Sequence, residues 1–231
     1  MRFTPSAADR NPLEAAVAAV AAVKPELRGW IHAGTFPLAL AAGIVLVVLA
    51  PNGKARFGAV IFAITAVLLF GTSAVYHRGN WSPHTRSVLR RVDHANIFLI
   101  IAGTYTPLCV MLLEDPTRTI VLSVVWAGAI LGVIFRVLWI NAPRWLYVPL
   151  YIALGWVAVG FVDEFYTTGG PAVVWLVAIG GLCYTVGAAI YGFKWPGKNA
   201  KYFGYHEIFH ALTVAAFACH YVATAIAIFN A

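Results

Sequence analysis

Charged side chains are scarce in this sequence. They make up 11% of the 231 residues, hydrophobic residues make up 61%, and the mean hydropathy is +0.80. A water-soluble domain carries roughly 25% charged residues, so this chain has too few to cover a surface in water. The scarcity excludes a soluble enzyme, a disordered tail and a coiled coil. It predicts an all-α membrane protein with several membrane-spanning helices.

The sequence also has few cysteines, and none are spaced as a metal-binding pair. Cys109, Cys183 and Cys219 each lie in an apolar run, which argues against a cysteine zinc site. The net charge is +7, but the 16 Lys and Arg residues are spread through short segments between apolar runs. We therefore expect no nucleic-acid partner.

Seven apolar runs approach the length needed to cross a bilayer, which is about 20 residues. Turn-forming sequences such as Asp115-Pro116 separate them. We therefore predict a seven-transmembrane-helix bundle over residues 33–231. The predicted spans are Ala33–Ala50, Phe57–Tyr76, Ala95–Leu113, Thr119–Ile140, Trp145–Val162, Pro171–Tyr191 and His206–Phe229.

The segment over residues 1–32 is predicted to be a cytoplasmic N-terminal segment and not a cleaved signal peptide. Its length and its acidic residues Asp9, Glu14 and Glu26 differ from the short, basic leader of a signal peptide. Within it, Pro12–Val23 is rich in alanine and carries apolar residues on one helical face. This pattern predicts a short helix at the membrane interface.

The distribution of Lys and Arg predicts the orientation, because these residues are more frequent on the cytoplasmic side. Thirteen of them fall on the side of the N-terminus and three on the other side, which places the N-terminus inside and the C-terminus outside. The thirteen are Arg2, Arg10, Lys24, Arg28, Arg78, Arg86, Arg90, Arg91, Arg136, Arg144, Lys194, Lys198 and Lys201, and the three are Lys54, Arg56 and Arg118.

Ionisable residues at the ends of several spans are predicted to meet. Such residues are costly in a membrane and are usually functional. The second span ends at His77, the third begins just after Asp93, and the seventh contains His206 and His210 in its first turns. The predicted topology places these four residues at one depth, near the cytoplasmic face.

The histidines among them have the spacing of metal ligands. His206 and His210 are four residues apart, so they share one helix face and can reach one cation. Alone, such a pair is as often a hydrogen-bonding pair between helices. A third imidazole from His77 makes a three-histidine site feasible, the set that holds catalytic zinc and leaves a position for water. Zinc would lower the pKa of that water to about 7.

Other polar residues near this site allow more than one interpretation. Asp93 can orient a water molecule, accept its proton or anchor a ligand imidazole, or it can pair with Arg90 or Arg91. Ser73 lies one turn before His77 and can bond to the backbone, a ligand or Asp93, or only pack.

Three further histidines are predicted to be of lesser importance. Successive helix positions differ by about 100°, so we expect His94 to point away from the face of Asp93. His32 and His220 are isolated in the sequence, and interface or packing roles are favoured for both.

At these residues the chain resembles the bacterial hemolysin III proteins, which belong with the progestin and adipoQ receptors, including the adiponectin receptors. The resemblance covers roughly residues 24–229. The motifs that carry it are Ser73-x-x-Tyr-His77, Asp93-His94-x-x-Ile97-x-x-x-Ile101-Ala-Gly-Thr-Tyr-Thr-Pro107, His206-x-x-x-His210 and Cys219-His220.

The resemblance implies a seven-helix bundle in the bacterial inner membrane, with the N-terminus inside. It implies zinc held by His77, His206 and His210, with Asp93 holding the zinc-bound water and Ser73 matching the family's serine. Many relatives carry Glu and Asn ahead of a Ser/Thr-His at the start of the first span, and here His32 alone matches.

The resemblance also implies a function. The wider superfamily contains alkaline ceramidases, so a zinc-dependent hydrolase acting on a lipid-like amide or ester is expected, with membrane lipids as partners. Two alternatives remain open: a zinc-stapled sensor of membrane state, and a pore-forming cytolysin, as the family name indicates.

Overall fold

The computed structural model describes residues 29–196 and 203–230, and this part of the chain is helical without strands. The predicted interfacial helix over Pro12–Val23 lies outside the described residues. The helices are α2 (Trp30–Leu49), α3 (Gly53–Arg78), α4 (Pro83–Leu112), α5 (Thr117–Leu138), α6 (Arg144–Gly155), the short 3₁₀-helix η2 (Trp156–Phe161), α7 (Val162–Phe193) and α8 (Tyr205–Phe229).

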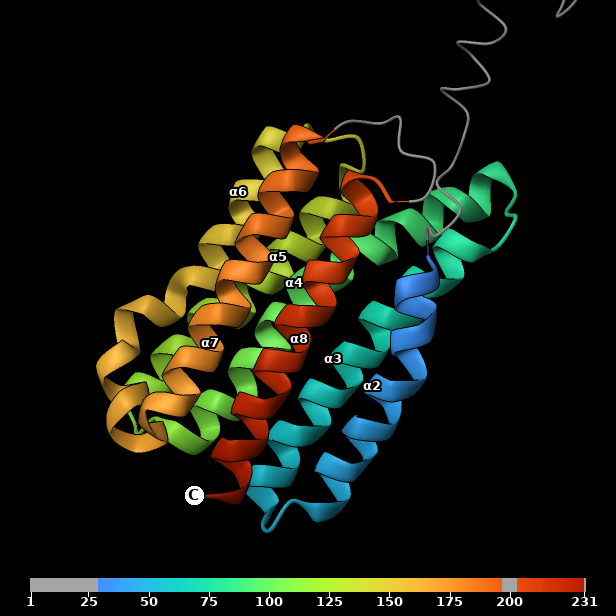
Figure 1. Ribbon diagram of the computed structural model, residues 1–231. Helices are drawn as coiled ribbons and strands as arrows, with labels where there is room; N and C mark the ends of the chain where they lie inside the picture. Colours follow the sequence, from blue (N-terminus) through green and yellow to red (C-terminus); the bar gives the residue numbers. More distant parts are fainter. Residues whose placement is uncertain (1–28, 197–202, 231) are drawn as a thin grey trace, which may run out of the picture.

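Six helical runs in the described chain are long and apolar enough to cross a membrane. The prediction of an all-α membrane protein is therefore confirmed. The fifth and sixth predicted spans fall together in one run, Arg144–Phe193, because α6, η2 and α7 follow one another without a loop. Figure 1 shows the chain descending through α6, reversing, and returning through α7.

Helix α7 is interrupted at Gly170, which has non-helical angles of φ 75° and ψ 173°. Glycine adopts a positive φ at little steric cost, and the following Pro171 disfavours a helical conformation in the residue before it. The Gly169-Gly170-Pro171 sequence thus marks a break within α7.

Helix α4 is longer than the predicted third span and begins at Pro83 instead of Ala95. The Ser82 side chain accepts a hydrogen bond from the Thr85 backbone N–H, and Pro83 occupies the first turn, where proline is favoured. Arg86, Arg90 and Arg91, which precede the predicted third span, lie on the first turns of α4. A hydropathy scan detects the apolar part of a helix and not its polar extension.

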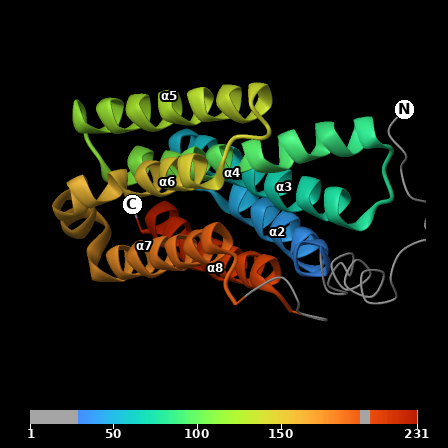
Figure 2. The same ribbon diagram turned by 90° about the horizontal axis from the view of Figure 1, so that it is seen from above.

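Helix α4 is the centre of the bundle. It packs against α3, α5, α6, α7 and α8, and Figure 2 shows it between the helices on either side. In its most apolar stretch 72% of the residues are buried, against 22–44% in the other five runs. The packing is close: a Cβ on Gly103 would lie 2.0 Å from the Thr65 hydroxyl oxygen of α3. The Gly103–Pro107 sequence of α4 therefore lies close against α3 at Gly103.

The outer surface of the bundle is largely apolar, as expected of helices in contact with lipid. Exposed large side chains include Leu38, Val48, Leu131, Trp145, Trp175 and Phe193. In Figure 1 the starts of α2 and α8 and the end of α3 lie toward one end of the bundle, and the C-terminus lies at the other.

Candidate metal centre

Three helices bring the predicted site residues together at one end of the bundle. His77 is in the last turn of α3, Asp93 is in the polar first half of α4, and His206 and His210 are in the first two turns of α8. The start of α8 is fixed by Glu207, whose carboxylate accepts a hydrogen bond from the Gly204 N–H at 2.9 Å. This capping contact sets where the two histidines of α8 lie along the bundle.

The three histidines form a compact cluster. One ring nitrogen of each of His77, His206 and His210 lies within 4.8 Å of the others, and the Nε2 atoms of His77 and His206 are 3.2 Å apart. His77 and His210 are buried. Zinc bonds to nitrogen of about 2.0–2.1 Å in a tetrahedron place ligand nitrogens about 3.3 Å apart. The 3.2 Å between His77 and His206 matches this separation and the His210 nitrogen lies within 4.8 Å of both, so the donor set fits a zinc ion.

Asp93 faces this cluster. Its Oδ2 atom lies 4.0 Å from Nε2 of His77 and 3.5 Å from Nδ1 of His94, and its side chain is 13% exposed. Among residues 29–196 and 203–230, the ion-pairing contacts of Asp93 are with these two histidines. Arg91 donates instead to the Ser87 hydroxyl and to the Val137 carbonyl. The carboxylate is therefore directed at imidazoles and not at Arg91.

The prediction that His94 points away from Asp93 was wrong. The ring turns back along α4, so that Nδ1 lies 2.9 Å from the Arg90 carbonyl and 3.5 Å from Asp93. A carbonyl only accepts, so Nδ1 carries the hydrogen and donates it to the Arg90 carbonyl, with the Asp93 carboxylate beside this N–H. The Tyr191 hydroxyl lies 3.5 Å from the other ring nitrogen. Side-chain rotation, which a helical wheel does not include, accounts for the difference.

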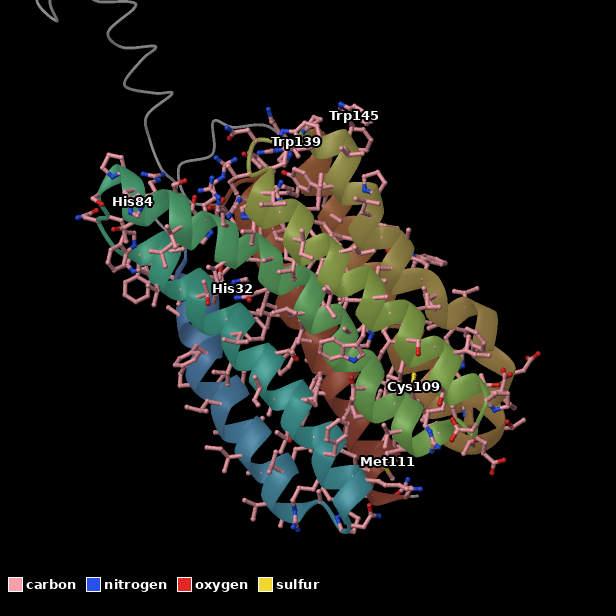
Figure 3. All side chains as sticks on the ribbon, turned by 180° about the vertical axis from the view of Figure 1, so that it is seen from behind. His32, His84, Cys109, Met111, Trp139 and Trp145 are labelled. Atoms are coloured by element: carbon pink, nitrogen blue, oxygen red, sulfur yellow. The ribbon has the colours of Figure 1, made fainter. Side chains whose placement is uncertain are left out.

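His32 was predicted to be a packing residue, and the structure places it against a candidate metal ligand. Its ring stacks on that of His210 with the centroids 3.9 Å apart and the planes within 4° of parallel. It is 2% exposed, and neither ring nitrogen has a hydrogen-bond partner in the described chain. Figure 3 shows His32 within the bundle, whereas His84 lies on the projecting start of α4.

The start of α2 also packs against His77. Gly29 precedes the helix with φ +83°, and a Cβ at this position would lie 2.6 Å from the Cβ of His77. A glycine is therefore required by both backbone conformation and space. In the sequence, the one sign that the first span lies near the site is His32, which matches a histidine of the hemolysin III family.

A cavity of about 130 Å³ reaches the cluster from inside the bundle. At this end it is lined by His32, Ser73, Asp93, His94, His206 and His210. Along α4 its lining extends from Asp93 to Leu108, which is roughly 22 Å at about 1.5 Å per residue. Most of the remaining lining is apolar, with residues such as Ile97, Ile101 and Val148. A long, largely apolar cavity thus ends at a polar cluster.

Comparison with known proteins agrees with the motifs. The model of the family described as "Haemolysin-III related" matches residues 20–221, a range that contains all the site residues above. The chain belongs to this family. The resemblance predicted from the sequence is confirmed.

Two haemolysin-III relatives are similar over most of their length. The "Hemolysin-3 homolog" of Bacillus subtilis (strain 168) is 28% identical over 180 residues, which cover 77% of this chain and 81% of that protein. The "Hemolysin-3" of Bacillus cereus is 29% identical over 157 residues, covering 67% and 71%.

The stacking of His32 predicts a specific mutational effect in this haemolysin-III related protein. His32→Ala leaves His210 without its stacking partner, so we expect the affinity of the histidine cluster for added zinc to fall about tenfold, the lower end of the cost of losing a partner of a metal ligand. His32→Phe keeps an aromatic ring and should restore most of the affinity. Competition with a chromogenic chelator measures both; equal affinities in wild type and His32→Ala would contradict the prediction.

Proposed function

We propose that this haemolysin-III related protein is a zinc-dependent membrane hydrolase that cleaves an amide or ester bond of a lipid. The observation that carries the proposal is the cavity, which is apolar along most of its length and ends at Asp93, His206 and His210. A lipid can lay its chain along the apolar part and present its polar linkage to the cluster. Pockets with a few convergent polar groups in an apolar lining are typical of binding sites.

His77, His206 and His210 would hold the zinc ion. Zinc bound by three imidazoles supplies Lewis acidity, which activates water toward a carbonyl at neutral pH. The short separation of these ring nitrogens supports this donor set.

Asp93 is the general base of the proposed reaction and accepts a proton from the attacking water. The N–H of His94 would hold its carboxylate in place, because the two lie 3.5 Å apart. Ser73, which lines the same end of the cavity, would donate a hydrogen bond to the carbonyl of the lipid linkage. His32 acts as a positioning residue through His210.

We further propose seven crossings, with the N-terminus and the metal centre on the cytoplasmic side of the inner membrane. The opposite directions of α6 and α7 in Figure 1 support two crossings within the run Arg144–Phe193. The start of α2 and the C-terminus lie at opposite ends of the bundle, as an odd number of crossings requires. The excess of Lys and Arg at the N-terminal side supports the direction.

Reporter fusions test this topology. A fusion after Ala231 should be active outside the cytoplasm, whereas one in the connection 79–82 should be active inside it. A periplasmic alkaline phosphatase and a cytoplasmic fluorescent protein, compared at both positions, give opposite readouts. A C-terminal fusion that is active only in the cytoplasm would contradict the seven-crossing topology.

Lipid hydrolysis by the purified protein tests the activity. The zinc-loaded wild type is incubated with ceramide-like and acyl-amide lipids, and release of free fatty acid is followed. We expect release from at least one lipid class, its loss after treatment with a chelator, and recovery when zinc is restored. Full zinc occupancy without release from any lipid would contradict a hydrolase and favour a zinc-stapled sensor of membrane state.

The pore-forming alternative is tested in the same preparation. A water-filled pore requires a polar lining, whereas the cavity is lined mainly by apolar side chains. We therefore expect no dye leakage from liposomes that contain the protein. Leakage that is the same in wild type and in variants of the metal cluster would favour the pore.

A further inference from the structure

The cavity contains a second polar region, far from the metal centre. It is formed by Tyr184 of α7 and His220 of α8, which both line the cavity and whose ring centroids are 5.6 Å apart. From His210 to His220 is roughly 15 Å along α8, at about 1.5 Å per residue. Tyr184 and His220 therefore lie beside the middle of any lipid chain that extends through the cavity from the metal centre.

His220 is held in one orientation by α7. Its Nε2 lies 3.3 Å from the Val177 carbonyl oxygen, and a Cβ on Gly180 would lie 2.6 Å from the same nitrogen. A carbonyl only accepts, so Nε2 is the donor. In the neutral ring Nδ1 is then an acceptor.

Helix packing leaves two polar atoms of this pair without a hydrogen-bond partner in the described chain. Nδ1 of His220 and the hydroxyl of Tyr184 are buried and have no hydrogen-bond partner among residues 29–196 and 203–230. His220 is 7% exposed. Buried polar atoms without partners are rare and costly, and each requires an explanation. Helix packing explains Nε2 but not Nδ1 or the Tyr184 hydroxyl.

We propose that Tyr184 and His220 form a subsite for a hydroxyl group carried on the chain of a lipid in the cavity. A hydroxyl can donate to Nδ1 of His220 and accept from Tyr184, so it satisfies both atoms. An ether, carbonyl or carboxylate oxygen only accepts and leaves Nδ1 without a donor. This subsite rests on the proposed function in one respect: the polar end of the lipid is taken to lie at the metal centre.

The separation of the two polar regions defines where the hydroxyl lies on the chain. A saturated chain advances about 1.25 Å per carbon, given a bond length of about 1.5 Å and near-tetrahedral angles. About twelve carbons therefore span the distance from the metal centre to Tyr184 and His220. We expect preference for a hydroxyl near the middle of the chain over one close to either end.

Fatty acids provide the probes, because they are products and not substrates of the proposed reaction. The zinc-loaded full chain in detergent micelles is mixed with equal amounts of stearic acid and one hydroxystearic acid, and native mass spectrometry gives the ratio of the two bound forms. We expect about tenfold more of the acid hydroxylated near carbon 12, from two added hydrogen bonds. Acids hydroxylated near carbon 6 or carbon 18 should bind no better than stearic acid, because their hydroxyl does not reach Tyr184 and His220.

Variants identify the residues responsible. Tyr184→Phe removes one hydroxyl and keeps the ring, and His220→Phe removes both ring nitrogens. Each leaves one of the two hydrogen bonds, so each should lower the preference for the mid-chain hydroxyl from about tenfold to about threefold. Tyr221→Phe is the matched control, because Tyr221 is the next residue on α8 and its hydroxyl donates to the Ala42 carbonyl. The control should keep the tenfold preference.

Two results would overturn the subsite: equal binding of stearic acid and every hydroxystearic acid by wild type, or a preference that is undiminished in both Tyr184→Phe and His220→Phe. If a variant does not fold, the comparison of hydroxystearic acids with the hydroxyl at different carbons, made with wild type, still tests the subsite. A protein that shows the preference but hydrolyses no lipid would overturn the proposed function alone. A protein that hydrolyses lipids without the preference would overturn the subsite alone.

Discussion

Purified protein is expected to bind about one zinc ion per chain, and His206→Ala or His210→Ala is expected to abolish this binding. Each substitution removes one of three ligands, which costs more than the roughly 10–100-fold loss that follows removal of a ligand's hydrogen-bond partner. His77→Ala should weaken binding strongly for the same reason. Metal analysis after gel filtration measures the occupancy, and titration with a chelator measures the affinity.

His84→Ala is the matched control for these three variants. His84 is exposed on the first turn of α4, away from the cluster, so its loss should leave zinc occupancy unchanged. Circular dichroism shows whether each variant remains helical. If all three cluster variants keep full zinc, the three-histidine site is wrong, and the 3.2 Å contact between His77 and His206 is a hydrogen bond between two helices.

Those features of the fold that follow from the length of the apolar runs could be predicted from the sequence. Long apolar runs give the positions of the helices, because a backbone in lipid must satisfy its own hydrogen bonds. Hydropathy could not give the start of α4, where Ser82 and Pro83 cap several polar turns, nor the continuous run from α6 to α7. These features depend on capping and backbone angles and not on contact with lipid.

The histidine cluster could be predicted because spacing and depth are both properties of the sequence. The i, i+4 pair on α8 and the end of α3 determined which histidines meet. The contacts of His32 and His94 could not be predicted, because each depends on a side-chain rotation or on the approach of one helix to another. The same holds for the cavity, whose length follows from where the packed helices leave space.

Replacing Asp93 by asparagine is expected to separate zinc binding from hydrolysis. Asparagine has nearly the size of aspartate but cannot accept a proton from water at neutral pH. Loss of a general base lowers a rate by typically 10²–10⁴-fold. Because Asp93 lies 4.0 Å from the nearest histidine of the cluster and outside the three-histidine set, the variant should keep most of its zinc.

The measurement combines zinc analysis with release of fatty acid from the best lipid substrate of the wild type. Asp163→Asn is the matched control, because Asp163 is exposed at the start of α7 and far along the chain from the cluster. It should keep both zinc and activity.

The two quantities distinguish three roles for Asp93. Zinc retained with hydrolysis lost supports the general base. Zinc and hydrolysis lost together would make Asp93 a ligand, and unchanged hydrolysis would contradict any catalytic role. The contact with His94 adds a finer test: His94→Phe removes the N–H that faces the carboxylate, so it should lower the hydrolysis rate by less than Asp93→Asn while leaving zinc bound. A larger loss in His94→Phe than in Asp93→Asn would instead make His94 the proton acceptor, with Asp93 as its partner.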